Sequence, residues 1–215
     1  MIGVLASGSG SNLGALLSQR DIRERISVVI SNNPNAKALQ RAEDANVPAL
    51  LINHRDFSKR DLFDQAIRDA LVEHKVDWVV LAGFMRIVGE NLLEAFPNRI
   101  LNIHPALLPA YPGLHGQRQA VHGLAKITGC TVHLVDGGVD TGPILAQAAL
   151  SVDVGDDERS LSKRILRLEH QLYPAVLKSI LTNGLTLGTN GEQRLADGLQ
   201  YYLSDKPAGV LFSPL

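Results

Sequence analysis

An amide, an imidazole and a carboxylate stand in two short segments near the middle of the chain. Asn102 and His104 lie in residues 101–105, and Asp140 lies in the turn-like residues 139–143. Residues two apart on an extended strand point to the same side, so Asn102 and His104 share one face. Together the three side chains can bind a developing oxyanion, donate a proton and orient the donor. This pattern favours a catalytic site, although Asp140 alone could be a plain turn residue.

The elements that would position these residues follow a regular alternation. Strands are expected at residues 2–6, 26–31, 49–52, 78–81 and 100–103, and helices at 12–19, 36–45 and 58–74. Short apolar strands separated by helices are typical of a parallel sheet covered on both faces. Because such connections are right-handed, the pattern predicts a doubly wound, mostly parallel α/β sheet. Its binding sites are expected at the carboxyl ends of the strands, where Asn102 and His104 lie.

The second half of the chain has a different pattern. Four Pro and Gly residues predict a loop from 105 to about 126, followed by strands at 129–135 and 144–152 around a turn. A long helix is expected to begin near Asp156 and Asp157, which can cap it. Pro174 should kink or interrupt that helix. Residues 185–187 are a possible edge strand.

Composition limits the class of protein. The chain has 215 residues, of which 45% are hydrophobic and 20% charged, as in soluble globular proteins. Its net charge of −1 counts weakly against a nucleic-acid partner. We expect no membrane span and no signal peptide. The single cysteine excludes an internal disulfide, and without a Cys/His cluster there is no structural zinc signature, so we expect a cytoplasmic location.

A glycine-rich loop follows the first expected strand. Gly10, Ser11 and Asn12 lie at the start of the first helix, where backbone N–H groups can approach an anion. The loop lacks Gly-Lys-Ser/Thr, and the second strand ends without an acidic residue, so neither a nucleoside triphosphate nor a dinucleotide is favoured. A small phosphate monoester fits better. A tight turn before a capped helix is the alternative, and the position at a strand end favours binding.

Three further features each admit two interpretations. Glu169 falls on the apolar stripe of the last helix, where a buried carboxylate needs a partner. The pattern favours a protein cation, Lys163 or Arg167, over a ligand amine. His133 either supports the site or packs in the core. Residues 84–88 either bind a flat heterocycle or form an ordinary connection packed between a strand and a helix. The pattern alone favours the second interpretation.

Two other interpretations concern metals and thiols. The His and Asp residues between 104 and 140 match no metal signature, so no metal is expected. Cys130 is interpreted as a small buried apolar residue.

Together these motifs resemble the phosphoribosylglycinamide formyltransferases, a folate-dependent formyltransferase family of purine biosynthesis. The likeness runs in order from residue 1 to about 180 and includes segments 8–12, 81–87, 101–105, 107–109, 111–115, 128–133, 140–143 and 169–170. Ala106 and Ala110 depart from many relatives, where Ser and a longer polar residue are common. Neither position matches a catalytic role. The resemblance implies a Rossmann-like formyltransferase fold.

The resemblance also implies substrates and residue roles. The donor is 10-formyltetrahydrofolate, used as a cosubstrate, and the acceptor is glycinamide ribonucleotide. Asn102, His104 and Asp140 are the implied catalytic residues. Gly10, Ser11 and Asn12 bind the acceptor's phosphate, and Glu169 binds its amine, which reverses the interpretation from pattern alone. The implied folate contacts are Arg60, Met85, Arg86, Ile87, Val88 and Asn102, with His133 in support.

We expect one formyltransferase domain over residues 1–215. It comprises a phosphate-binding half at 1–100, a catalytic and folate-binding half at 101–182, and a tail at 183–215. The partners expected are small molecules, with no nucleic acid or membrane, and the protein is a monomer or homodimer. A tRNA formyltransferase would need a further, more basic domain. A formyltetrahydrofolate hydrolase would carry an additional regulatory domain, and a non-catalytic binding module would not require the trio.

Overall fold

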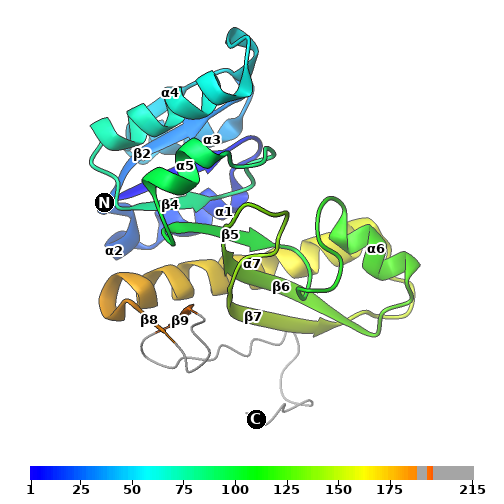
Figure 1. The fold of residues 1–215 in the computed structure, drawn as a ribbon. Coiled ribbons are helices and arrows are strands. Elements are labelled where there is room, and N and C mark those ends of the chain that lie inside the picture. The colour runs from blue at the N-terminus through cyan, green and yellow to red at the C-terminus, as the bar shows by residue number, and fades with distance from the viewer. Residues whose placement is uncertain (188–192, 196–215) are drawn as a thin grey trace. The chain divides into compact units, whose positions relative to one another are not determined.

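The computed structural model describes residues 1–187 and 193–195. The strands are β1 (Ile2–Ala6), β2 (Ile26–Ser31), β3 (Ala49–Leu51), β4 (Trp78–Leu81), β5 (Ile100–His104), β6 (Ile127–Leu134), β7 (Ile144–Ser151), β8 (Leu185–Leu187) and β9 (Gln193–Leu195). The helices are α1 (Ser11–Ser18), α2 (Arg20–Arg23), α3 (Lys37–Asp44), η1 (His54–Asp56, a 3₁₀ turn), α4 (Arg60–Glu73), α5 (Glu90–Ala95), α6 (Gly116–His122) and α7 (Glu158–Asn183). Figure 1 labels most of them.

The sheet confirms the predicted α/β class. Seven strands are hydrogen-bonded in the order β3-β2-β1-β4-β5-β6-β7, and β8 and β9 form a separate two-stranded sheet. The chain divides into two compact units, the first made of residues 1–102 and 134–142, the second of residues 103–133 and 143 onwards. The predicted single domain, with halves meeting at residues 100 and 101, stays a prediction.

The first unit contains the parallel strands. β1 pairs in parallel with β2 and β4, β2 with β3, and β4 with β5. Leu5 and Ile30 pack with Phe63 of α4 in the core on one face of this sheet. Side chains alternate along a strand, so Val4 and Val29 point to the other face, and both are fully buried. Both faces of these strands are therefore covered, as predicted for a doubly wound sheet.

Most expected elements are confirmed to within two residues. The strands at 2–6, 26–31 and 78–81 have the predicted bounds, and β5 runs one residue further, to His104. The expected loop from 105 to 126 is wrong in part, because α6 lies within it. Only Gly116 and Ala120 of α6 are buried, so the helix has no apolar stripe that a sequence pattern could show.

The second unit contains the antiparallel pair β6–β7 and the long helix α7, drawn as a continuous coil in Figure 1. Of the two effects predicted for Pro174, a kink or an interruption, the interruption is wrong, because α7 continues to Asn183, and the kink stays a prediction. A proline inside a helix costs about 3 kcal/mol. Burial of a large apolar side chain contributes roughly 1.5–3 kcal/mol. Leu172 and Val176 on either side of Pro174 are fully buried, so their burial outweighs the proline's cost.

The predicted strand at 185–187 is confirmed as β8, which pairs with β9. Residues 188–192 and 196–215 of the predicted tail lie outside the described residues. None of the helices described has both the length and the hydropathy that a membrane crossing needs.

Candidate active site

The glycine-rich loop ends in a left-handed glycine that starts α1. Gly10 has φ of 66°, and a Cβ on it would lie 2.9 Å from the Ala38 Cα, so only glycine fits without strain. The first helical hydrogen bond of α1 runs from the Gly14 N–H to the Gly10 carbonyl at 2.8 Å. The N–H groups of Ser11 and Asn12 therefore lie in the first turn of α1. This turn carries the partial positive charge that favours an anion.

Helix α3 braces this loop, and the sequence analysis did not predict it. The Ala38 N–H donates to the Gly8 carbonyl at 3.2 Å. The Arg41 Nε donates to the Ser9 carbonyl at 2.9 Å, and its Nη1 lies 3.3 Å from the position of a Cβ on Gly14. Arg41 thus places a cation beside the first turns of α1. Its position within a helical stretch gave no sequence signal for this contact.

Arg60 and residues 85–88, five of the predicted folate contacts, are linked by a hydrogen bond. The Arg60 Nη2 donates to the Ile87 carbonyl at 3.0 Å, and the Arg86 guanidinium lies 5.1 Å from the centre of the Phe63 ring. Met85 and Ile87 expose 70% and 58% of their surface, which is suited to apolar contact with a ligand. Val88, by contrast, is buried in the core.

A buried carboxylate supports this segment. Asp64 is 2% exposed, and its Oδ2 lies 3.4 Å from the Arg60 Nε. A Cβ on Gly89, the residue that starts α5, would lie 2.0 Å from that Oδ2. Burial raises the pKa of Asp64, and the charge of Arg60 offsets only part of that effect. The pair with Arg60, four residues apart on a helix, was visible in the sequence, but the contact with Gly89 was not.

Asn102 and Asp140 also belong to the first unit. Asn102 stands opposite Leu81 in the β4–β5 register and is half-buried. Asp140 has φ of 54°, a left-handed conformation that is uncommon outside glycine and that clusters at functional sites. The turn that carries it is tied by Asp136, which accepts from the Thr141 hydroxyl at 2.7 Å and from the Gly138 N–H at 3.0 Å.

His104 is buried at the end of β5, at the start of the second unit. Its Nε2 lies 2.8 Å from the Tyr111 carbonyl. A carbonyl only accepts, so Nε2 carries the proton of this hydrogen bond. The position of a Cβ on Gly116 lies 3.4 Å from the same nitrogen, which makes the approach of α6 close. These contacts fix the orientation of the imidazole.

The loop after His104 is pinned by two polar side chains of the β6–β7 pair. The Thr131 hydroxyl donates to the Ala106 carbonyl at 2.7 Å and accepts from the Leu108 N–H at 3.0 Å. The Gln147 Nε2 donates to the Leu108 carbonyl at 2.8 Å. The backbone between His104 and Tyr111 is therefore held at its middle.

Glu169 and His133 are buried in the second unit, at 6% and 2% exposure. Lys163 and Arg167, the protein cations that the pattern favoured as partners of Glu169, are exposed on α7. Cys130 is fully buried, as predicted. Burial first, and the charge of Glu169 second, raise the pKa of its thiol. Cys130 therefore stays protonated and is a poor nucleophile.

The predicted site residues thus fall into two groups. The first unit holds Gly10, Ser11, Asn12, Arg60, Met85, Arg86, Ile87, Val88, Asn102 and Asp140, and the second holds His104, His133 and Glu169. Within residues 1–187 and 193–195, no three His, Cys, Asp or Glu side chains gather so as to hold a metal ion.

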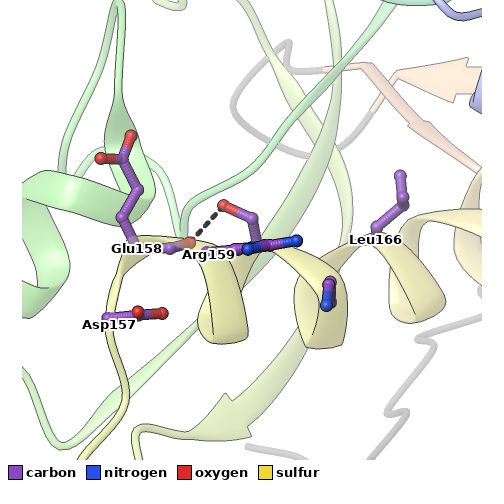
Figure 2. A pocket seen from close by; sticks show the side chains of 6 residues that line it. Asp157, Glu158, Arg159 and Leu166 are labelled. Carbon is purple, nitrogen blue, oxygen red and sulfur yellow. Dashed lines mark hydrogen bonds between the residues drawn. The ribbon is translucent and has the colours of Figure 1, made fainter.

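A hollow of about 560 Å³ lies elsewhere, on the first turns of α7 (Figure 2). It is lined by Asp157, Glu158, Arg159, Ser162, Lys163 and Leu166. The dashed bond in Figure 2 runs from the Ser162 hydroxyl to the Glu158 carbonyl, at 2.6 Å. None of the predicted site residues lines this hollow, and it is open to solvent, so we do not assign the chemistry to it.

Comparison with known proteins gives consistent matches. Residues 1–177 match the family described as formyl transferase. Phosphoribosylglycinamide formyltransferase of Bacillus subtilis is 40% identical over 83% of this chain and 93% of its own length. The enzyme of that name from Mycobacterium tuberculosis is 46% identical over 86% of each chain. A trifunctional purine biosynthetic protein of Drosophila melanogaster is 46% identical, but this chain spans only 14% of its length.

Solved structures agree. Glycinamide ribonucleotide transformylase 1 of Symbiobacterium toebii has a TM-score of 0.85 and 46% identity, over 91% of this chain and 92% of its own. Phosphoribosylglycinamide formyltransferase of Anaplasma phagocytophilum has a TM-score of 0.86 and 38% identity, over 95% of this chain and 98% of its own. The family match includes every predicted site residue.

Proposed function

Because this chain belongs to the formyl transferase family, we propose that it transfers the formyl group of 10-formyltetrahydrofolate to the amine of glycinamide ribonucleotide. The products are formylglycinamide ribonucleotide and tetrahydrofolate, a step of purine biosynthesis. The observation that carries the proposal is the position of Asn102 and His104, two residues apart at the carboxyl end of β5. It occurs in a chain that matches enzymes of this name over most of both lengths.

The chemistry assigned to the residues is acyl transfer without a covalent enzyme intermediate. The neutral amine of the acceptor attacks the formyl carbon and forms a tetrahedral intermediate with an oxyanion. Asn102 and protonated His104 donate hydrogen bonds to that oxygen. Asp140 stabilises the charged imidazole and takes the proton that the amine loses, directly or through water. The bond from the formyl carbon to the folate nitrogen then breaks as that nitrogen gains a proton.

This mechanism requires the hydrogen bond between His104 and Tyr111 to break during the reaction. An imidazolium has two N–H groups. Hydrogen bonds to the oxyanion and to Asp140 use both, so none is left for the Tyr111 carbonyl that Nε2 contacts at 2.8 Å. We therefore expect the bond to Tyr111 to open when the substrates bind.

The binding roles follow the two groups of residues. Gly10, Ser11 and Asn12 receive the acceptor's phosphate on the first turn of α1. Glu169 pairs with its amine. Arg60, Met85, Arg86, Ile87 and Val88 bind the folate together with Asn102, and His133 supports the catalytic residues.

The test is a direct assay of the protein with 10-formyltetrahydrofolate, followed by folate absorbance, with and without glycinamide ribonucleotide. We expect loss of the formyl group only when the acceptor is present. Asn102→Ala and His104→Ala should each lower kcat about a hundred- to a thousandfold, with modest changes in KM. His122→Ala, at an exposed histidine of α6, is the matched control and should behave as wild type.

Other outcomes would overturn the proposal. Formyl loss without acceptor would indicate a hydrolase. Folate binding without turnover would indicate a binding module. Near wild-type kcat in both Asn102→Ala and His104→Ala would remove the assignment of the catalytic residues.

We also propose that the protein acts in the cytoplasm on these small molecules alone, as a monomer or homodimer and without a metal. The single buried cysteine suits a reducing compartment. Light scattering after size-exclusion chromatography decides between monomer and dimer. Unchanged turnover after dialysis against a chelator supports the metal-free assignment.

A further inference from the structure

Ser7, the residue that joins β1 to the glycine-rich loop, makes hydrogen bonds to two other loops. Its hydroxyl donates to the Asn32 Oδ1 at 2.6 Å and accepts from the Met85 N–H at 2.8 Å. Its own N–H donates to the Gly83 carbonyl at 3.1 Å. Ser7 is 9% exposed and Asn32 5%, so water competes little for these bonds.

The direction of these bonds fixes the role of each atom. Met85 N–H can only donate, so the Ser7 oxygen must accept from it. The Ser7 proton is then directed to Asn32, whose side-chain oxygen accepts it. Asn32 is in turn held by His54. The His54 Nδ1 lies 3.0 Å from the backbone carbonyl oxygen of Asn32 and 3.3 Å from the Nδ2 of its side chain. The result is a chain of hydrogen bonds from the Met85 N–H through the buried Ser7 to the buried Asn32.

The loop itself does not need this chain of hydrogen bonds. Its later residues are held by other contacts: the Gly8 carbonyl by Ala38, the Ser9 carbonyl by Arg41, and Gly10 by the first bond of α1. Residues 84–89, by contrast, form no helix or strand, and the Met85 side chain is 70% exposed. A hydrogen bond to the Met85 N–H therefore has more effect on the 85–88 segment than on the anion-binding turn.

We propose that Ser7 is a positioning residue for the formyl donor, although it lies in the loop that receives the acceptor's phosphate. It holds the Met85 backbone, and through it the exposed Met85 and Ile87 side chains, in the position that binds the folate. This inference rests on the proposed function, which assigns the 85–88 segment to the donor.

The experiment compares alanine variants of two serines four residues apart, Ser7 after β1 and Ser11 at the start of α1. Ser7→Ala leaves the Met85 N–H without its partner and should raise the KM for 10-formyltetrahydrofolate about five- to tenfold. The KM for glycinamide ribonucleotide and kcat should change by less than about twofold, because the anion-binding turn keeps its own contacts. Ser11→Ala should do the reverse and raise mainly the acceptor's KM. A merely structural loss would raise both KM values in Ser7→Ala.

Two further variants guard against misfolding and unspecific effects. Asn32→Ala breaks the chain of hydrogen bonds at its other end and should raise the donor's KM in the same direction, and the double variant should add little to either single change. Ser27→Ala removes a hydroxyl from the neighbouring strand β2, with only a long 3.4 Å contact to the Ile2 carbonyl, and should leave both KM values unchanged.

Direct binding separates this inference from the proposed function. Calorimetric titration with tetrahydrofolate should show weaker binding to Ser7→Ala than to wild type, and titration with glycinamide ribonucleotide should show equal binding. If the wild type transfers formyl groups but Ser7→Ala keeps the donor's KM, or raises the acceptor's instead, the inference is wrong and the function stands. If the wild type neither binds the folate nor transfers the formyl group, both are wrong.

Discussion

At the scale of single residues, Asp64 is a carboxylate whose burial opposes its charge. Burial raises its pKa, and the nearby Arg60 offsets this only in part. A carboxyl group whose pKa is higher in the folded than in the unfolded protein binds its proton more readily when folded. Its contribution to the free energy of unfolding therefore falls as the pH rises through the window from the unfolded pKa to the folded pKa.

We predict that Asp64→Asn removes the loss of unfolding free energy that the buried carboxyl group causes as the pH rises. Near neutral pH, well above the unfolded carboxyl pKa, the variant should be at least as stable as the wild type. Below the unfolded carboxyl pKa, about 3.9, both side chains are neutral and any advantage of the variant should shrink. Urea unfolding at the two pH values measures this. Asp61→Asn, at an exposed position of the same helix, is the control.

The opposite result would be informative as well. A variant much less stable than wild type at neutral pH would show that the charged form of Asp64 is net stabilising, and a raised pKa would then be wrong.

The sequence predicted site residues where the residue type itself carries chemistry. Asn102 and His104 could be proposed from the sequence because they stand two residues apart at the carboxyl end of one expected strand. Ser7 and Asn32 could not, because a serine and an asparagine at strand ends are common in turns. Their proposed role comes from the contact of Ser7 with Met85, far away in the sequence, and of Asn32 with Ser7, which only the folded chain creates.

At the scale of elements, the start of α7 is set by a capping box. The Ser160 N–H donates to Asp157 Oδ1 at 2.7 Å, and the Asp157 N–H donates to the Ser160 hydroxyl at 3.0 Å. Arg164 adds to this turn by donating to Asp156 at 2.5 Å and to the Ser151 carbonyl at 2.8 Å. The two bonds between Asp157 and Ser160 satisfy backbone N–H groups that the helix itself cannot pair.

We predict that Asp157→Ala lowers the thermal midpoint of unfolding, because the first turn of α7 loses its cap. Asp157→Asn keeps an acceptor at the same place and should lose less. The hydrogen bond from the Ser160 N–H lowers the pKa of Asp157 in the folded protein. A lowered carboxyl pKa gives stability that is present above the unfolded pKa and is lost as the pH falls through the folded one. The difference in thermal midpoint between Asp157→Ala and wild type should therefore shrink in acid. A difference that stays constant with pH would contradict the role of the Asp157 charge.

The expectations that failed at this scale have physical reasons. α6 could not be predicted because it buries only its small residues, and the residue before it, His115, has a left-handed conformation. Pro174 does not interrupt α7, because local propensity is outweighed by the buried apolar face on both sides of it. Strand bounds were predictable because β1, β2 and β4 are almost wholly apolar between turn residues.

At the scale of the whole molecule, ligand binding should appear as stability. A ligand that binds only the folded protein at a hundred times its dissociation constant stabilises it by about 2.7 kcal/mol. For a chain of this length, that corresponds to a rise in Tm of about 5–10 °C. We predict such a rise with glycinamide ribonucleotide and a much smaller one with the nucleoside that lacks the phosphate. Scanning calorimetry measures both, and equal rises would contradict a phosphate-binding role for residues 10–12.

The family and the enzyme class predicted from the sequence are confirmed by the match over residues 1–177 and by relatives of that name. The motifs could identify the family because their order and spacing extend over most of the chain. The division into units at residues 102 and 103 could not be read in the same way, because it falls inside the single strand β5.

The burial of Cys130 makes the chain convenient for spectroscopy. It is the single cysteine of the sequence, it is fully buried, and its thiol stays protonated. Maleimide dyes, which react with exposed thiolates, should leave the native protein unlabelled. A cysteine introduced at the fully exposed Val154 would then accept a fluorophore or spin label alone, with Trp78 as the single intrinsic tryptophan donor. Binding of either substrate could be followed at one chosen point without first removing a native cysteine.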